Sequence, residues 1–413
     1  MTVHPTRLKT VAETQLAAQF AALGDVSPAR KAAFAVFEAT GLPNKRIEAY
    51  HFTDLRAALS ALLPLARASC EAKAWNFNRD ASETLVVVRD GRFDPDLSDP
   101  MPEGVALHVL EAATSETADP VIALNLAFSE QELLLTVGAG VHVAKPVKLL
   151  ALSSTAGGRA VFRHTKVVLG AGASLTLVES ADGAAAPNQA NVLLSLELED
   201  GAKLSHIARI AAGQGLVLAT VDARVGAHCE LSSFALLSGG TLVRRQLFVA
   251  LNGAHSNLSL DGVSLLRGAQ HIDTTLTVTH KAAHCTSRET FRHIVQDEAT
   301  GVFQGKIVVT PGAQKTDGKM MSKTILLSDN AVMNNKPELE IFADDVVCGH
   351  GATVGALDEN QIFYARTRGI PKQEAQALLL EAFAGEVIDT ISHQASRDAM
   401  HDHLRGWLAE RKA

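Results

Sequence analysis

The chain has 413 residues, of which 47% are hydrophobic and 20% are charged, a balance typical of a soluble globular protein. Its formal net charge of −7 argues against general nucleic-acid binding, which usually needs a basic surface. The N-terminus lacks the pattern of a secretory signal, and no stretch has the roughly 18 uninterrupted apolar residues of a membrane helix. We therefore expect a cytoplasmic protein that binds neither nucleic acid nor membrane.

Residues 1–80 are predicted to form an N-terminal helical region. Leu16, Phe20 and Leu23 lie at i, i+4 and i+7, which places them on one face of a helix. A second apolar face predicts a helix over 54–65, and its residues are Leu55, Leu59, Leu62 and Leu63. Several short helices are thus expected before the strand-forming sequence begins.

Residues 81–365 are predicted to be rich in β-strand. From about residue 130 onward, apolar and polar residues alternate with period two, and turn residues recur about every 8–12 residues. No amphipathic helix interrupts these runs, which argues against a doubly wound parallel sheet. Short segments such as GAGAS, EDGAK, VGAH and LNGAH recur before the runs as an approximate repeat. We predict a mainly β fold with a parallel β-helix (solenoid) core, in preference to a large sandwich.

Residues 366–413 are predicted to form a C-terminal helical region. Pro371 suits the first position of a helix, and a last helix is expected over 396–411. The first of these helices carries one apolar stripe, made of Ala377, Leu380, Phe383, Ala384, Val387, Ile388 and Ile391. Because a solenoid must cover its ends, both helical regions are expected to cap it. The stripe could equally form a docking face for another protein.

The sharpest candidate site is the pair Cys348 and His350. Residues two apart on a strand project from the same face, so the thiol and the imidazole are expected to point together. Soft metals and iron–sulfur centres prefer these ligands. Two ligands do not complete a metal site, so other groups must come from elsewhere, including another chain. The alternative is a small buried cysteine beside a surface histidine.

Two other interpretations remain open from the residues alone. The first is an autonomous metal-binding β-helix protein, whose candidate ligands are His280, His284, Cys285, Cys348 and His350. The second is a carbohydrate-active enzyme built on a β-helix, for which the available carboxylates are Asp261, Asp273 and Asp297. Their spacing does not identify a catalytic pair.

The last third of the chain resembles the SufB/SufD family of SUF iron–sulfur cluster assembly proteins. The segments that carry this resemblance are GVFQGKIVV, GAQKTD, KPELEIFADDVVCGHGATVG and FYARTRGI, together with the earlier HKAAHCTS and GLPNKRIEAYHFTDL. In SufB-like members a glutamate follows the histidine equivalent to His350, whereas Gly351 follows it here. The strand KMMSKTILLS also lacks the SufB-type cysteine. The chain is therefore most similar to the SufD branch of the family.

The resemblance implies a scaffold subunit of a SufBCD-like complex and not an enzyme. The expected partners are a SufB-like paralogue and a SufC-like ABC ATPase, with a homodimer when the chain is isolated. It makes His350, and secondarily Cys348, candidate ligands of iron or a transient iron–sulfur cluster at the partner interface. No cofactor is expected to bind the isolated chain tightly. The C-terminal region is expected to dock the ATPase, with partner-binding candidates Phe383, Val387, Ile388 and Ile391.

Overall fold

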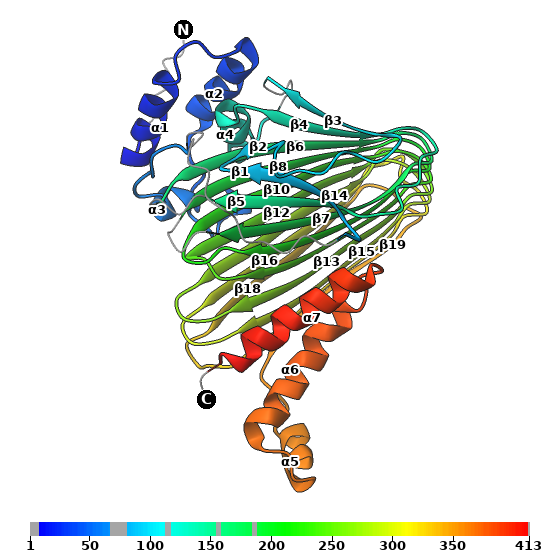
Figure 1. The fold of residues 1–413 in the computed structure, drawn as a ribbon. Coiled ribbons are helices and arrows are strands. Elements are labelled where there is room, and N and C mark those ends of the chain that lie inside the picture. The colour runs from blue at the N-terminus through cyan, green and yellow to red at the C-terminus, as the bar shows by residue number, and fades with distance from the viewer. Residues whose placement is uncertain (1–7, 67–80, 112–116, 154–157, 184–187, 412–413) are drawn as a thin grey trace.

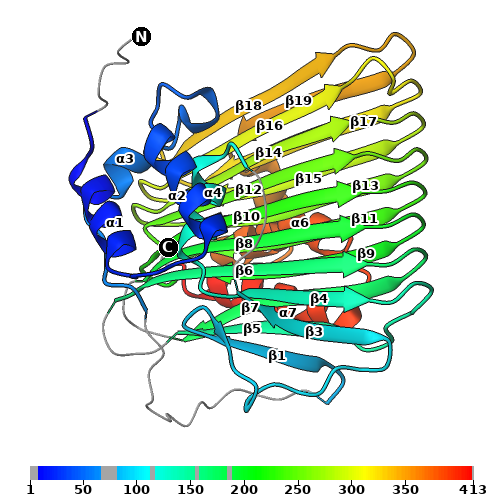
Figure 2. The same ribbon diagram turned by 90° about the horizontal axis from the view of Figure 1, so that it is seen from above.

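The chain folds as a flattened solenoid of two long sheets that lie face to face (Figure 1, Figure 2). The computed structural model describes residues 8–66, 81–111, 117–153, 158–183 and 188–411. From β4 onward the chain passes alternately through the two sheets, and each strand up to β17 pairs with the strand two places later in sequence. The predicted mainly β class and the parallel β-helix core are confirmed.

The first sheet, sheet A, has nine strands in the order β3, β4, β6, β8, β10, β12, β14, β16 and β18. From β4 onward all neighbours are parallel, whereas β3 pairs with β4 in the antiparallel direction. Its strands are β3 Val105–Leu110, β4 Glu132–Val137, β6 Ala160–Leu169, β8 Gln189–Leu198, β10 Leu216–Val225, β12 Leu242–Leu251, β14 His271–His280, β16 Thr300–Val309 and β18 Val332–Ile341.

The second sheet, sheet B, has ten strands in the order β2, β1, β5, β7, β9, β11, β13, β15, β17 and β19. Its neighbours are parallel except for the short β1–β2 pair. Its strands are β2 Arg92–Phe93, β1 Thr84–Arg89, β5 Val147–Ser153, β7 Ser174–Gly183, β9 Lys203–Ala211, β11 Glu230–Ser238, β13 Asn257–Leu266, β15 Thr286–Val295, β17 Asp317–Leu326 and β19 Val347–Gly355.

Columns of aliphatic side chains fill the space between the two sheets. On sheet A, Val249, Val278 and Ile307 are register partners in successive strands, and all three are buried. Because parallel strands pair in register, side chains of similar size stack along the solenoid and fill the narrow core without aromatic bulk. The alternation that predicted the strands thus corresponds to an inner face that forms the main hydrophobic core.

The N-terminal helices pack on the outer face of sheet A, and their core includes Leu216 and Leu218 of β10. The helices are α1 Val11–Ala21, α2 Pro28–Thr40, η1 Glu48–Tyr50, α3 Leu55–Ala58 and α4 Pro120–Phe128. The predicted helix over 54–65 was wrong in extent, because α3 makes a single turn before the chain extends toward Pro64. Residues 67–80, the end of the predicted N-terminal region, lie outside the described residues.

The C-terminal helices pack on the outer face of sheet B, mainly over β13 and β15. They are α5 Glu359–Thr367, α6 Lys372–Ile388 and α7 Gln394–Ala409. The prediction that the helical regions cap the ends of the solenoid was wrong. The outward-facing residues of both sheets include apolar side chains, so the helices bury the outer faces instead.

A buried charge network fixes the N-terminal region to the solenoid. Arg244 and Asp273 are both fully buried and form an ion pair. Arg244 stacks on the ring of Tyr50 at 4.0 Å and donates to the carbonyl of Ala49 at 2.7 Å. Thr53 donates to the same carboxylate. Because each charge has several partners, these interactions offset the cost of removing Arg244 and Asp273 from water. They also hold the N-terminal helices in one defined position on sheet A.

Candidate functional site

The last strand of each sheet has one edge that is not paired with another described strand. In the described part of the chain, β18 pairs only with β16 and β19 pairs only with β17. Large apolar side chains at this end are exposed, namely Met321, Val332, Ile341, Phe342, Val347 and Val354. Unpaired backbone groups beside exposed apolar residues are a template for pairing with another chain. We call this surface the open end.

Strand β19 carries Cys348 and His350 at the open end. In register, Cys348 lies opposite Gly318 and His350 lies opposite Met320, a residue of the solenoid core. Cys348 packs partly against that core, whereas His350 is exposed. Because side chains alternate along β19, both of these point to the core-facing side of the strand, at the open end. Burial raises the pKa of the Cys348 thiol, and the nearby Asp317 and Glu289 carboxyls raise it further.

A buried polar group lies two strands behind this pair. Glu289 is the register partner of Met320, which in turn pairs with His350, and Glu289 is fully buried. Burial raises the pKa of its carboxyl to about 8, although the neighbouring Ser287 hydroxyl opposes the shift. Ser287 also lies 3.0 Å from Nε2 of His280, whose pKa falls to about 4 because it is buried. The neutral carboxyl of Glu289, the hydroxyl of Ser287 and the neutral imidazole of His280 thus lie inside the solenoid, next to the open end.

Sequence inspection did not identify Glu289 or Met320 as part of this region. Both residues enter it through strand register, which places β15, β17 and β19 side by side. The sequence does contain one signal for Glu289. It lies two residues before Phe291 on the same strand, so its side chain points inward like that of Phe291, which belongs to the core. A charged residue at an inward position is rare unless it is neutral or paired.

The state of Glu289 predicts that the folded chain loses stability as pH rises. Between pH 4.5 and about 8, the Glu289 carboxyl is protonated in the folded state and ionised in the unfolded state. The free energy of unfolding should therefore fall with pH in this window, by at most about 1.4 kcal/mol per pH unit. Glu289→Gln, which stays neutral, is expected to flatten the fall in urea unfolding measured at pH 5, 6.5 and 8. Glu230→Gln, at an exposed pair with Lys203, should keep the wild-type slope, and an equal slope in all three proteins would contradict this assignment.

The other predicted ligand groups are not brought together. His280 is buried, His284 is exposed on a turn, and the Cys285 thiol lies 3.2 Å from the carbonyl of Gly253. Among the residues that the structure describes, no group of three or more His, Cys, Asp or Glu side chains is arranged to hold a metal ion.

The three aspartates considered for sugar cleavage are also dispersed. Asp261 lies on β13 of sheet B, whereas Asp273 lies on β14 of sheet A and is paired with Arg244. Asp297 lies in the turn after β15, where it accepts a hydrogen bond from the Gly268 amide at 2.7 Å. The structure therefore presents them as groups with separate local partners.

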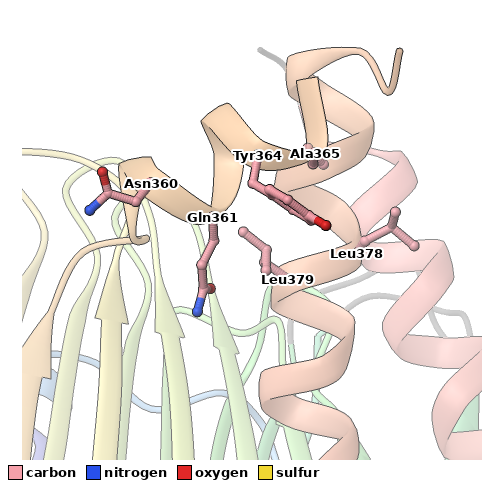
Figure 3. A pocket seen from close by; sticks show the side chains of 7 residues that line it. Asn360, Gln361, Tyr364, Ala365, Leu378 and Leu379 are labelled. Atoms are coloured by element: carbon pink, nitrogen blue, oxygen red, sulfur yellow. The ribbon is translucent and has the colours of Figure 1, made fainter. Parts of the chain in front are cut away.

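A second exposed apolar surface lies on α5 and α6, away from the sheets (Figure 1). Phe363 and Tyr364 of α5 are 66% and 62% exposed, and Leu378 of α6 is 49% exposed. Tyr364, Leu378 and Leu379 line a hollow of about 490 Å³ between the two helices (Figure 3). We call this surface the α5–α6 hollow.

The predicted apolar stripe on α6 faces the solenoid instead. Val387, Ile388 and Ile391 are buried with Leu236, Val263 and other residues of sheet B, and Phe383 is partly buried against the same cluster. Val387, Ile388 and Ile391 are therefore covered by packing in this conformation, whereas Phe383 keeps part of its surface exposed. Partner binding by the C-terminal region remains a prediction, and the exposed residues that could carry it are those of the α5–α6 hollow.

No helix in the described ranges is both long enough and apolar enough to cross a membrane. Comparison with known proteins gives a more specific result. Residues 152–383 match the family described as "SUF system FeS cluster assembly, SufBD core domain". This match covers more than half of the chain and the solenoid strands from β6 to β19.

Several known proteins are similar over most of the chain. The iron–sulfur cluster assembly protein SufD of Escherichia coli is 31% identical over 370 residues, which cover 85% of this chain and 86% of that protein. A SufBD family protein of Synechocystis is 28% identical and covers 85% of this chain and 84% of its own length. SufD of Bacillus subtilis is 26% identical and covers 65% of this chain and 62% of its own. By family match, identity and coverage, the chain belongs to the SufB/SufD family of SUF iron–sulfur cluster assembly proteins.

Proposed function

We propose that this chain is the SufD-like, non-catalytic scaffold subunit of a cytoplasmic iron–sulfur cluster assembly complex. Membership of the SufB/SufD family supports a role in iron–sulfur cluster assembly. The observation that carries the finer proposal is the open end, where a thiol and an imidazole lie on an edge strand among exposed apolar residues. A surface of this kind suits a partner that completes both the sheet and the ligand set.

The partner that we propose is a SufB-like paralogue with its own open end. Pairing two solenoids along their last strands would satisfy unpaired backbone groups and bury Val347 and Val354. His350 and Cys348 would then face ligands of the partner across the seam, and iron or a nascent cluster would bind there as cargo. Because the pKa of the Cys348 thiol is raised, cluster binding must displace its proton. In the absence of the paralogue, a second copy of this chain would cover the same edge.

We further propose that the α5–α6 hollow docks a SufC-like ABC ATPase. Exposed aromatic and aliphatic side chains around a hollow are typical anchor sites for another protein. Helix α6 also contacts sheet B directly, through the ion pair of Arg292 with Glu386 and the core around Val387. Movement of docked ATPase subunits would therefore be transmitted to the solenoid through a packed helix.

The docking proposal predicts a selective loss of ATPase binding when the hollow becomes charged. Leu378→Asp should weaken binding of the ATPase by about tenfold or more, because a carboxylate would be buried without a partner. Gel filtration and calorimetry with the purified ATPase measure this effect. Gln373→Asp, at an exposed position on the same helix, is the matched control and should bind normally. Equal binding by both variants would contradict docking at the hollow.

Removal of the whole C-terminal region would be a poorer test. The helices cover Ile207, Phe234, Leu236, Val263, Leu265 and Ile294 of sheet B. Their deletion would expose this apolar face and destabilise the solenoid. Loss of binding in such a variant would not separate docking from unfolding.

The proposal as a whole is tested by purification of the tagged chain from its native cells under anaerobic conditions. Recovery of an ABC ATPase and a cysteine-bearing paralogue in fixed stoichiometry is the expected result. Recovery of the chain without either protein would contradict the scaffold assignment. If stoichiometric metal or a glycan came with it, the result would instead favour an autonomous metal-binding protein or a carbohydrate-active protein.

A further inference from the structure

Three histidine side chains form a stack on the turns that join sheet A to sheet B. His228, His255 and His284 lie in the turns after β10, β12 and β14, along the edge of the solenoid where successive turns are stacked (Figure 2). The ring centroids of His228 and His255 are 5.0 Å apart, and those of His255 and His284 are 4.7 Å apart. Adjacent rings are within 11° of parallel, and all three residues are exposed. We call this group the histidine ladder.

The fold does not require histidine at these positions. Each ladder residue has a positive φ, of 56°, 63° and 58° in chain order, a conformation that favours glycine. The amide of each residue donates to a carbonyl in the next turn, and the same pattern runs back through earlier turns. The equivalent residues there are glycines with φ of 69°, 68° and 75°, namely Gly140, Gly172 and Gly201. Glycine therefore builds this turn, and three successive histidines occupy it at a conformational cost.

The ring nitrogens of the ladder are free to bind a ligand. Among the described residues, none forms a hydrogen bond with a ring nitrogen of His228, His255 or His284. The next turn carries Lys315 at the equivalent position, where it pairs with Asp345. That cation ends the ladder beyond His284, and Gly201 ends it before His228.

Neighbouring imidazoles of the ladder are spaced closely enough to chelate one metal ion. Imidazole is a good ligand for Zn²⁺, Ni²⁺ and Cu²⁺. With metal–nitrogen distances of about 2.0–2.1 Å, two nitrogens on one ion lie at most about 4 Å apart. The ring centroids are 4.7–5.0 Å apart and the rings are nearly parallel. Binding of one ion by two of them therefore requires the exposed side chains to rotate until one nitrogen of each ring points at the ion. The stack is a set of pairs and not a closed three-ligand site, which agrees with the absence of such a site in the described ranges.

We propose that the histidine ladder binds one divalent transition-metal ion, such as Ni²⁺ or Zn²⁺, between two adjacent imidazoles, with water as the remaining ligands. His255 belongs to both possible pairs, so it is the essential residue, whereas His228 and His284 are alternatives to each other. The ladder lies on the turns, while Cys348 and His350 lie on the last strand of sheet B. The inference therefore does not depend on the proposed role in cluster assembly.

The first test is a calorimetric titration of the purified full chain with Ni²⁺, repeated with Zn²⁺. His255→Gly should weaken binding by roughly tenfold or more, because each remaining imidazole must bind alone. Glycine is chosen because it occupies the equivalent turns and keeps the positive φ. His228→Gly and His284→Gly each leave one pair and should weaken binding by no more than about threefold. His142→Ala, an exposed histidine bonded to Ser174 at 2.9 Å on the same edge, should bind as the wild type does.

The second test adds a ligand instead of removing one. A side chain at Gly201 would meet only ordinary contacts, with Gly172 at 3.6 Å. Gly201→His should therefore extend the ladder to four imidazoles and raise the stoichiometry from one ion to two, as two separate pairs. Unchanged affinity in His255→Gly, or unchanged stoichiometry in Gly201→His with the histidine in place, would overturn the proposal. Circular dichroism and the melting temperature verify that each variant is folded.

Discussion

His350→Ala is expected to lower the iron and sulfide content of the co-purified assembly complex by about tenfold, while the complex itself still forms. The side chain is exposed at the open end, so its removal creates no cavity. It stands opposite the core residue Met320, and strand β19 remains paired with β17 in the variant. Loss of an outer-shell partner of a metal ligand typically costs roughly 10–100-fold in affinity, so loss of the imidazole ligand itself should cost at least about tenfold.

The measurement is iron, acid-labile sulfide and visible absorption per complex after anaerobic co-expression with a cysteine-bearing paralogue and the ATPase. Thr353→Ala is the matched control, because Thr353 is exposed on the same strand but has the opposite parity to His350. The control should load normally. Normal loading of His350→Ala would exclude a ligand role, whereas failure of the complex to assemble would assign His350 to pairing.

The strands were predictable because alternation and burial coincide. The inward columns around Val249, Val278 and Ile307 follow the period of two that the sequence displays. Helix α4 was missed because eight of its nine residues are buried, so it shows no polar face. A short apolar run of this kind cannot be separated from a buried strand by periodicity. The placement of helices on the faces was also hidden, since it depends on apolar residues that point outward, such as Leu218.

The candidate site was predictable only where it is local. Cys348 and His350 lie two apart on one strand, so their shared face follows from strand geometry. Glu289 lies near them only because it is the register partner of Met320, which is the register partner of His350. The number of residues between successive register partners varies along the solenoid, so this pairing cannot be read from a fixed spacing. Register of this kind is set by turn length and core packing across rungs, which a one-residue shift in a turn would change. The α5–α6 hollow likewise depends on how two helices fold back on each other.

Ala352→Pro should weaken self-association of the isolated chain by about thirtyfold, equivalent to about 2 kcal/mol, without unfolding it. The amide of Val347 donates to Thr316 of the preceding turn at 2.8 Å. Since alternate residues of a parallel strand bond to opposite sides, the amide of Ala352 points away from β17 toward the free edge. Proline at this position removes a donor that only a partner would use, and edge strands tolerate it.

Sedimentation over a range of concentrations gives the dimerisation constant, and binding to the paralogue should weaken in parallel. Ala352→Val is the control, because it keeps the amide and favours a strand. Thr353→Pro provides the opposite case, since its amide bonds to β17 and its loss should lower the melting temperature. If Ala352→Pro associates as tightly as Ala352→Val, pairing does not use this edge, and Cys348 and His350 do not lie at a seam between two chains.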